Sequence, residues 1–306
     1  MTKREIPFEG GSHSSVVRVG PTVRRVSRSS SSTVLDLLRH LERERFVGAP
    51  RALGFDDQGR EVLAYIEGEV GRGDSFVPDQ GGRFDRRLPK FVWSDDALVH
   101  LGALIRAYHD AAASFPWAGR EWCFEPRQPV ETVCHNELFP WNTVFRAGVP
   151  VAFIDWDTAA PGPRVWDLGL AAWHWVPFAR DEKCLAIGLP IGVANKARRF
   201  RLLLDTYGLQ PDIGIVQAGI ERVRQFLEHM WRLVADGSEW RWSSLVAVCS
   251  TSWRLRSPGW KSTLFRLWSH DLPHRAYKRR GTLDPSDPSR TRFRALSPAP
   301  VLGDDA

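Results

Sequence analysis

The chain has 306 residues, of which 43% are hydrophobic, 42 are Lys or Arg and 36 are Asp or Glu. This length and composition permit either one bilobal domain with a large core or two smaller domains, and the lack of any run of about 18 apolar residues argues against a membrane-spanning helix. The net charge of +6 does not indicate a nucleic-acid-binding core, because residues 237–306 hold 12 Lys/Arg against 6 Asp/Glu and the rest of the chain holds 30 of each.

The cysteines and the N-terminus indicate in which cellular compartment the protein is expected. Cys123, Cys134, Cys184 and Cys249 lack the spacing of a metal site, and residues 1–10 lack the apolar segment of a signal peptide. We therefore predict free thiols and a cytoplasmic protein. Nothing in the sequence specifies the oligomeric state.

The first predicted elements are two strands, a helix and a further strand. Residues 15–19 and 23–26 are β-prone and flank a Gly-Pro turn, which predicts a hairpin. Apolar residues at helical spacing predict a helix over 34–41 with Thr33 as its cap. The next strand is predicted at 61–66.

Helical patterns dominate the later part of the chain. Apolar faces predict helices over 98–108, 197–207 and 216–234. Ser94 or Asp95 would cap the first of these helices, and Gly208 would end the second. A short strand is predicted at 131–134. The helical periodicity then fades. Residues 237–306 are rich in Trp, Ser, Pro and basic side chains, which predicts a partly disordered basic tail.

The most informative segment carries Glu137, Asn142 and Asp155. Residues 142–145 and 151–154 are β-prone and flank an Ala-Gly turn, so we expect a hairpin whose open end brings Asn142 and Asp155 together, near the loop with Glu137. Two carboxylates and a carboxamide oxygen that converge in this way form a site of hard oxygen ligands, which suits Mg²⁺.

Three motifs in this segment follow one another in a characteristic order. They are His-Asn-Glu-Leu-Phe-Pro-Trp-Asn-Thr-Val-Phe at 135–145, Ile-Asp-Trp-Asp at 154–157 and Ala-Pro-Gly-Pro-Arg-Val-Trp-Asp-Leu at 160–168. A His-x-acid loop, an Asn five residues after the acid and a hairpin that ends in Asp resemble the catalytic core of kinase-like phosphotransferases. The surrounding residues resemble the branch of aminoglycoside phosphotransferases and choline kinases, over roughly residues 9–235.

The resemblance implies an α+β, protein-kinase-like bilobal fold. A small antiparallel sheet would form an N-terminal nucleotide-binding lobe over residues 1–68. A mainly helical C-terminal lobe over residues 69–236 would carry the catalytic loop and the acceptor site. Residues 237–306 would remain outside both lobes as the tail.

The resemblance also implies roles for the polar residues of the motifs. Glu137 would orient the acceptor hydroxyl where the family has Asp, and Asn142 and Asp155 would hold the metal ion. His135 would brace the catalytic loop, and Asp167 would support it by accepting hydrogen bonds. Because a shift of about one ångström can cost ~10²-fold in rate, the longer Glu137 predicts a slower or re-tuned enzyme.

The resemblance also implies a nucleotide site, formed by a loop near the N-terminus and by the hinge between the lobes. A glycine-containing loop would cover the phosphates, and the main chain of the hinge would meet adenine. The residues of these two segments are Gly10, Gly11, Ser12, Tyr65, Ile66 and Glu67.

The basic residue that kinases use to hold the phosphates has no Lys counterpart here, since no Lys occurs between Lys3 and Lys90. Arg24 or Arg25 would take its place, because Arg can bind phosphate with two nitrogens. Arg25 is favoured because it shares a strand face with Val23. The early helix offers no well-placed Glu as its ion-pair partner.

We therefore predict a phosphotransferase that uses ATP or GTP with Mg²⁺ and acts on a hydroxyl of a small molecule, with no nucleic-acid partner for the core. Two alternatives stay open. Glu137 and the missing Lys are also compatible with a nucleotide-binding pseudoenzyme. The basic tail is compatible with a binding protein that acts through it.

Overall fold

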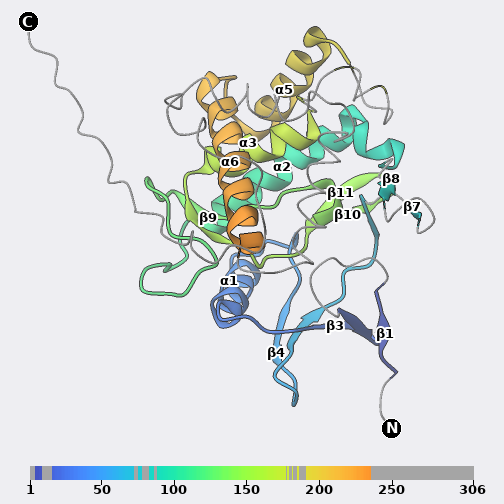
Figure 1. The fold of residues 1–306 in the computed structure, drawn as a ribbon, viewed down its shortest axis with the longest axis vertical. Helices are drawn as coiled ribbons and strands as arrows, with labels where there is room; N and C mark the ends of the chain where they lie inside the picture. Colours follow the sequence, from blue (N-terminus) through green and yellow to red (C-terminus); the bar gives the residue numbers. More distant parts are fainter. Residues whose placement is uncertain are drawn as a thin grey trace, which may run out of the picture. The chain divides into compact units, whose positions relative to one another are not determined.

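The computed structural model of the protein describes most of the chain up to residue 235 (Figure 1). The described residues are 4–8, 16–71, 75–77, 83–85, 88–176, 178, 181, 185 and 191–235. The predicted phosphate-covering residues Gly10, Gly11 and Ser12 and the predicted tail lie outside them.

The N-terminal part forms an antiparallel sheet with the strand order β1-β2-β3-β5-β4. Its strands are β1 (Ile6–Pro7), β2 (Val17–Val19), β3 (Thr22–Arg25), β4 (Ala52–Phe55) and β5 (Glu61–Ala64). The register between β3 and β5 places Val23 opposite Leu63 and Arg25 opposite Glu61. This register matters for the site, because residues directly opposite each other in a sheet point to the same face.

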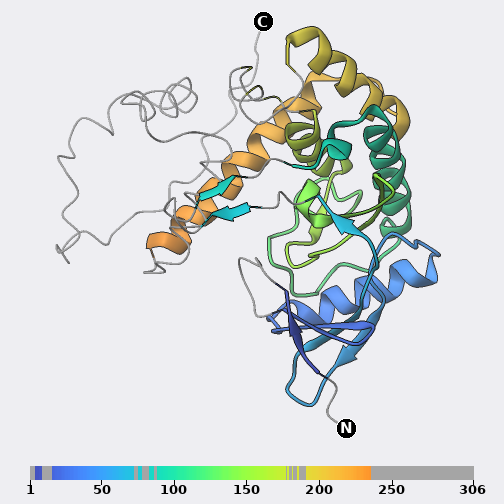
Figure 2. The same ribbon diagram turned by 90° about the vertical axis from the view of Figure 1, so that its right-hand side faces the viewer.

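Helix α1 (Ser31–Arg43) lies beside this sheet (Figure 2). Its apolar residues Val34, Leu38 and Leu41 are buried, as the helical spacing predicts. The predicted cap at Thr33 is wrong, because the helix begins two residues earlier and Ser30 occupies the cap position. Thr33 is buried within the first turn.

A second sheet, ordered β11-β10-β6, carries the predicted hairpin. It consists of β6 (Glu69–Val70), β10 (Thr143–Arg146) and β11 (Val149–Phe153). Ala147 and Gly148 have φ angles of 50° and 80° and form the turn, which is the geometry of tight hairpins. Thr143 pairs with Phe153, and the N–H of Ile154 donates to the carbonyl oxygen of Asn142 at 2.8 Å.

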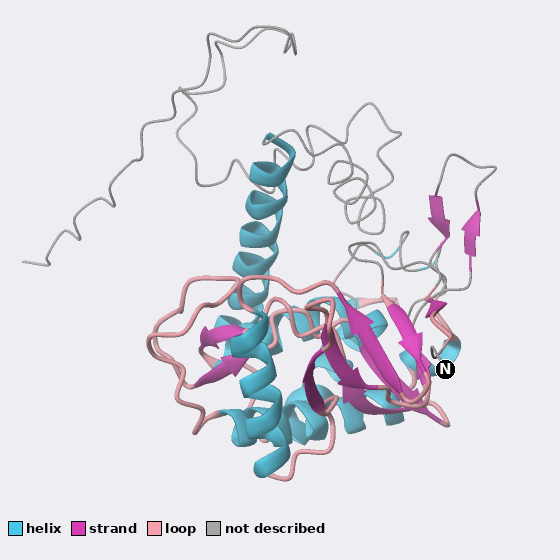
Figure 3. Ribbon diagram, turned by 90° about the horizontal axis from the view of Figure 1, so that it is seen from below, coloured by secondary structure: helices cyan, strands magenta, loops and turns pink. Residues whose placement is uncertain are grey.

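The helices of the second part are α2 (Asp95–Ala112), α3 (Arg164–Trp175), α5 (Val193–Tyr207) and α6 (Ile213–Ala235). The short elements between them are β7 (Ser75–Val77), β8 (Arg83–Asp85), β9 (Thr132–Cys134) and β12 (Ala160–Gly162), with 3₁₀ turns at Lys90–Trp93 and Pro140–Asn142. Figure 3 shows the strands in magenta among the helices in cyan. Of the two predicted cap residues, Ser94 caps α2 and accepts from the N–H of Ala97 at 3.0 Å.

Helices α3 and α6 touch backbone to backbone. A Cβ atom added to Gly169 would overlap the backbone nitrogen of Gly219, and one added to Gly219 would overlap the carbonyl oxygen of Gly169. Glycine at both positions is what permits this approach. The contact brings the following turn of α6, with Arg222, to the loop around Asn136.

One buried cluster of apolar side chains joins these elements. It includes Leu101 and Tyr108 of α2, Phe153 of β11 and Trp175 of α3, each with no more than 1% of its surface exposed. Full burial of each such side chain stabilises the fold by about 1.5–3 kcal/mol. Among the described helices, none has the length and apolar character needed to cross a membrane.

Candidate active site

Asp167 anchors the loop that precedes the hairpin. Its buried carboxylate, in the first turn of α3, accepts the backbone N–H groups of His135 and Asn136, both at 2.7 Å. His109 lies 3.2 Å from the same carboxylate through Nε2. Burial alone would raise the pKa of Asp167, but the hydrogen bond and charge of His109 and the interactions with His135 hold that pKa below its ordinary value. The loop is therefore tied to an ionised carboxylate.

His135 connects this loop to the strand that leads to Asp155. Its Nδ1 accepts from the backbone N–H of Glu137 at 3.3 Å, and its Nε2 lies 3.1 Å from the carbonyl oxygen of Ile154. The ring packs on Trp156, with centroids 4.6 Å apart. Burial lowers the pKa of His135 to about 4, so the ring is neutral near pH 7 and donates from Nε2. Its position agrees with the bracing role proposed from the sequence.

Glu137 and Asn142 lie side by side at the open end of the hairpin. The Asn142 side-chain nitrogen Nδ2 donates to the main-chain oxygen of Glu137 at 3.1 Å and lies 3.4 Å from its carboxylate oxygen Oε2. Because Nδ2 is oriented by these contacts, the side-chain oxygen of Asn142 is the atom that can serve as a metal ligand. Burial, and next the negative charge of Asp155, raise the pKa of Glu137 to about 8.

Asp155 follows the second strand of the hairpin in a left-handed conformation, with φ of 66°. Such a conformation is uncommon for a residue other than glycine and is frequent at functional sites. Half of its side chain is exposed. A carboxylate and a carboxamide oxygen fit Mg²⁺, which usually takes one or two protein ligands and completes its shell with phosphate oxygens and water. Among the described residues, no group of three His, Cys, Asp or Glu side chains is placed to hold a metal ion, so the expected site rests on the Asp155 carboxylate and the Asn142 carboxamide oxygen.

Arg25 extends from β3 toward the carboxylate of Asp155 and those of two neighbouring acidic residues. Its side chain, 9% exposed, is ion-paired with Glu61 and Asp157, and its Nη1 lies 3.3 Å from Asp155 Oδ1. Burial alone would lower the pKa of Arg25, but the charges of Asp157, Glu61 and Asp155 raise it. The guanidinium is thus a fixed positive charge beside the proposed metal ligands.

Arg24 lies on the other face of β3. It is paired with Asp56 at 3.5 Å and contacts Thr22. Of the two candidates for the phosphate-binding residue, the structure therefore brings only Arg25 to Asp155, in line with the strand-face argument.

The proposed hinge follows β5. The N–H of Tyr65 donates to the carbonyl oxygen of Pro21 at 2.9 Å, and the carbonyl oxygen of Glu67 accepts from Arg146 Nε at 3.0 Å. These two main-chain groups are already bonded. Ile66 lies between these two residues.

Three functional candidates were missed or left undecided by the sequence reasoning. Glu61 is the partner of Arg25, and only the register between β3 and β5 reveals it. Asp157, which the sequence alone leaves as either a charge near the metal or substrate or a solvated turn acid, pairs with Arg25 and lies 2.9 Å from Arg28 Nε. Buried Arg222 donates from Nη2 to the carbonyl oxygen of Asn136 at 3.0 Å, and its charge acts on Glu137. No local pattern in α6 points to it.

Comparison with known proteins gives matches over most of the chain. Residues 5–189 match the model of the phosphotransferase enzyme family. The trifolitoxin immunity protein of Rhizobium leguminosarum bv. trifolii is 33% identical over an alignment of 277 residues, which covers 84% of this chain and 94% of that protein.

Many solved structures match this chain in fold, and two of them serve as examples. A choline/ethanolamine kinase family protein from Mesorhizobium loti has a TM-score of 0.50 at 14% identity, covering 86% of this chain and 92% of that one. A spectinomycin phosphotransferase, solved in complex with ADP and spectinomycin, has a TM-score of 0.50 at 10% identity and covers 82% and 88% of the two chains. These similarities confirm the α+β, kinase-like bilobal fold predicted from the motifs.

Proposed function

The chain belongs to the phosphotransferase enzyme family, which confirms the resemblance drawn from its motifs, and on this basis we propose that it transfers the γ-phosphoryl group of ATP or GTP to a hydroxyl of a small molecule. The observation that carries the proposal is the meeting of Glu137, Asn142, Asp155 and Arg25 at one end of the hairpin. Because the proposed donor is a nucleoside triphosphate, we place the reaction in the cytoplasm.

In the proposed reaction, each polar side chain has one task. Glu137 acts in its ionised form, which a pKa of about 8 makes the minor form near pH 7. Its carboxylate accepts the proton of the acceptor hydroxyl while the hydroxyl oxygen bonds to the γ-phosphorus, and the bond from that phosphorus to the β–γ bridging oxygen breaks to release ADP or GDP. Asp155 and the side-chain oxygen of Asn142 would hold Mg²⁺, which neutralises charge on the phosphate oxygens. Arg25, which lies beside Asp155, would bind the phosphates.

The surrounding residues keep these groups in place. Asp167 and His135 accept hydrogen bonds from the backbone N–H groups of residues 135–137. The backbone that carries the Glu137 side chain is therefore held in place. Glu61 and Asp157 hold the guanidinium of Arg25. Preorganised charges of this kind supply much of the rate in phosphoryl transfer, where the protein does little covalent chemistry.

The acceptor is proposed from the immunity protein that the chain resembles. We propose that the acceptor is a hydroxyl-bearing toxin and that the phosphate added to it lowers its toxicity. Aminoglycosides, which give the branch its name, are alternative acceptors and should be tested together with the toxin.

The test is phosphate transfer from labelled Mg-ATP or Mg-GTP to trifolitoxin, aminoglycosides, amino sugars and choline-like alcohols. We expect one acceptor class to be phosphorylated. Removal of the proton acceptor in Glu137→Gln should reduce the rate by ~10²–10⁴-fold, and Glu137→Asp should raise it, because the shorter side chain restores the usual geometry. A rate that falls in Glu137→Asp, or is unchanged in Glu137→Gln, would contradict the assigned role.

A nucleotide-binding pseudoenzyme is the second candidate. It is favoured by the ion pair between Arg25 and Asp155. In that pair the Asp155 charge needed for a metal ion and the Arg25 charge needed for phosphates partly neutralise each other. This candidate predicts Mg-nucleotide binding without transfer to any acceptor in the panel. The third alternative, a binding protein that acts through residues 237–306, concerns residues outside those described and stays a prediction from the sequence.

A further inference from the structure

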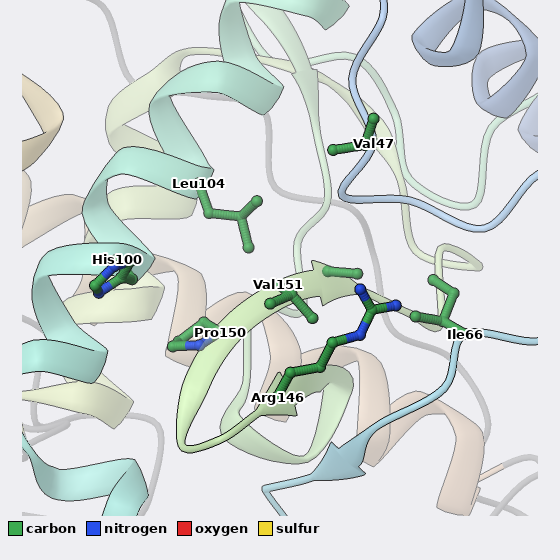
Figure 4. Close-up of a pocket in the computed structure, with 8 residues that line it drawn as sticks. Val47, Ile66, His100, Leu104, Arg146, Pro150 and Val151 are labelled. Carbon is green, nitrogen blue, oxygen red and sulfur yellow. The ribbon is translucent and has the colours of Figure 1, made fainter.

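A pocket of about 400 Å³ lies apart from the candidate active site (Figure 4). Its walls come from α2, from the hairpin of β10 and β11, and from the segments that follow α1 and β5. Glu137, Asn142, Asp155 and Arg25 do not line it. We call it the hinge-side pocket, because Ile66 of the proposed hinge forms part of its wall. Its volume falls within the range of small-molecule sites, about 300–1,000 Å³.

The body of the hinge-side pocket is apolar. Val47, Ile66, Leu104 and Val151 face it from four separate segments of the chain. Val47 is 91% exposed, so an apolar side chain stands in water at the rim. A ligand with an apolar body would remove this surface from water, which favours binding.

One cation enters this apolar space. Arg146 extends from the end of β10 toward Ile66 (Figure 4), and its Nε donates to the carbonyl oxygen of Glu67 at 3.0 Å. That bond orients the guanidinium. Within the described part of the chain no carboxylate lies in ion-pair range of Arg146, whereas Arg18, which also meets Glu67, is paired with its carboxylate at 2.7 Å. Arg146 thus brings a positive charge to an apolar pocket.

We propose that the hinge-side pocket binds a small apolar anion, with an aromatic or branched body against Val47, Leu104 and Val151 and an acid group on Arg146. The acid group is a carboxylate or sulfonate, since a planar guanidinium binds two oxygens of either. This assignment does not rest on the proposed phosphotransfer, because Glu137, Asn142, Asp155 and Arg25 do not line the pocket. The two proposals share only the hinge, where Ile66 gives its side chain to the pocket and the Glu67 carbonyl oxygen orients Arg146.

The test uses the full chain and two fluorescent probes with similar aromatic bodies. Anilinonaphthalene sulfonate carries the acid group, and phenylnaphthylamine is its neutral counterpart. We expect a single saturable site for the sulfonate. Leu104→Trp, which fills the pocket, should abolish binding of both probes. Arg146→Gln should weaken the sulfonate by about tenfold, as expected for loss of a charge-assisted contact, and leave the neutral probe unchanged.

Control variants separate the site from general effects on folding. Val47→Asp changes an exposed residue and puts a like charge at the rim, so it should weaken the sulfonate more than the neutral probe even if Leu104→Trp folds poorly. Arg18→Gln, which removes an exposed arginine outside the pocket, should bind both probes as the parent does. Lack of saturable binding by the parent would overturn the proposal. So would unchanged binding in Leu104→Trp and Val47→Asp, or an equal response of the two probes to Arg146→Gln.

Discussion

Arg25 occupies the position where the resemblance would lead one to expect a lysine, and its neighbours show how a guanidinium is held there. Its three nitrogens reach three carboxylates, those of Glu61, Asp155 and Asp157. A lysine ammonium has one nitrogen and could not meet all three with the same geometry. The partner that kinases take from a helix here comes from the neighbouring strand β5, because Arg25 and Glu61 are directly opposite in the sheet.

Arg25→Gln should therefore weaken Mg-nucleotide binding. Loss of hydrogen bonds to a charged group costs about 1.5–3 kcal/mol, or roughly tenfold to a hundredfold in affinity. Arg24→Gln, on the opposite face of β3, is the matched control and should change affinity by less than about twofold. Calorimetric titration with a non-hydrolysable nucleotide measures both.

Stability must be measured beside that affinity, since Arg25→Gln also leaves Glu61 buried without its cation, a change that costs about 3–5 kcal/mol in comparable pairs. The double variant Arg25→Gln/Glu61→Gln should recover much of the stability but not the affinity. Recovery of both would show that Arg25 acts on the fold alone.

Asp167 makes a pH-dependent contribution to stability. Its folded pKa lies below the ordinary value of about 3.9, so the stabilisation is complete above that value and is lost as the pH falls through the folded pKa. Asp167→Asn should cost about 3 kcal/mol near pH 7, and the difference from the parent should shrink toward pH 3. Urea unfolding at several pH values checks this, with the exposed Asp57→Asn as control. A difference that is constant with pH would refute the ionised state of Asp167.

At the scale of elements, predictions from the sequence succeeded where local chemistry decides the structure. The Ala147-Gly148 turn, the Ser94 cap of α2 and the Gly208 end of α5 all lie where their residue types predict. Thr33 failed as a cap because four consecutive serines and threonines follow Ser29 and propensity does not choose between them. Burial of Ser31 and Thr33 in α1 settled the choice.

The approach of α3 to α6 is a feature that helical periodicity does not reveal. Gly219→Ala should separate the two helices, because its added methyl group meets the backbone of Gly169. Overpacking of this kind costs about 1–3 kcal/mol, which corresponds to roughly 2–4 °C in Tm per kcal/mol. Gln217→Ala, at an exposed position of the same helix, should change stability by less than about 0.5 kcal/mol. Thermal unfolding of the two variants compares them, and equal Tm values would contradict a backbone contact between α3 and α6.

At the scale of the molecule, the division between what could and could not be predicted follows sequence separation. Glu137, Asn142 and Asp155 lie within one hairpin and its loop, so spacing alone predicted that they meet. Glu61 and Arg222 come to the site from far along the chain, through a strand register and a helix crossing that no local pattern specifies. The hinge-side pocket was missed for the same reason, because four separate segments build it.

The central claim is that Asp155 helps to hold a divalent metal ion with a nucleotide. The most direct measurement is thermal unfolding of the parent, Asp155→Asn and the control Asp57→Asn, each with and without Mg-ATP. We predict that Mg-ATP at about a hundred times its Kd stabilises the parent and the control by about 2.7 kcal/mol, that ATP without Mg²⁺ does so much less, and that Asp155→Asn gains little. Equal stabilisation of Asp155→Asn, or none in the parent, would contradict the claim.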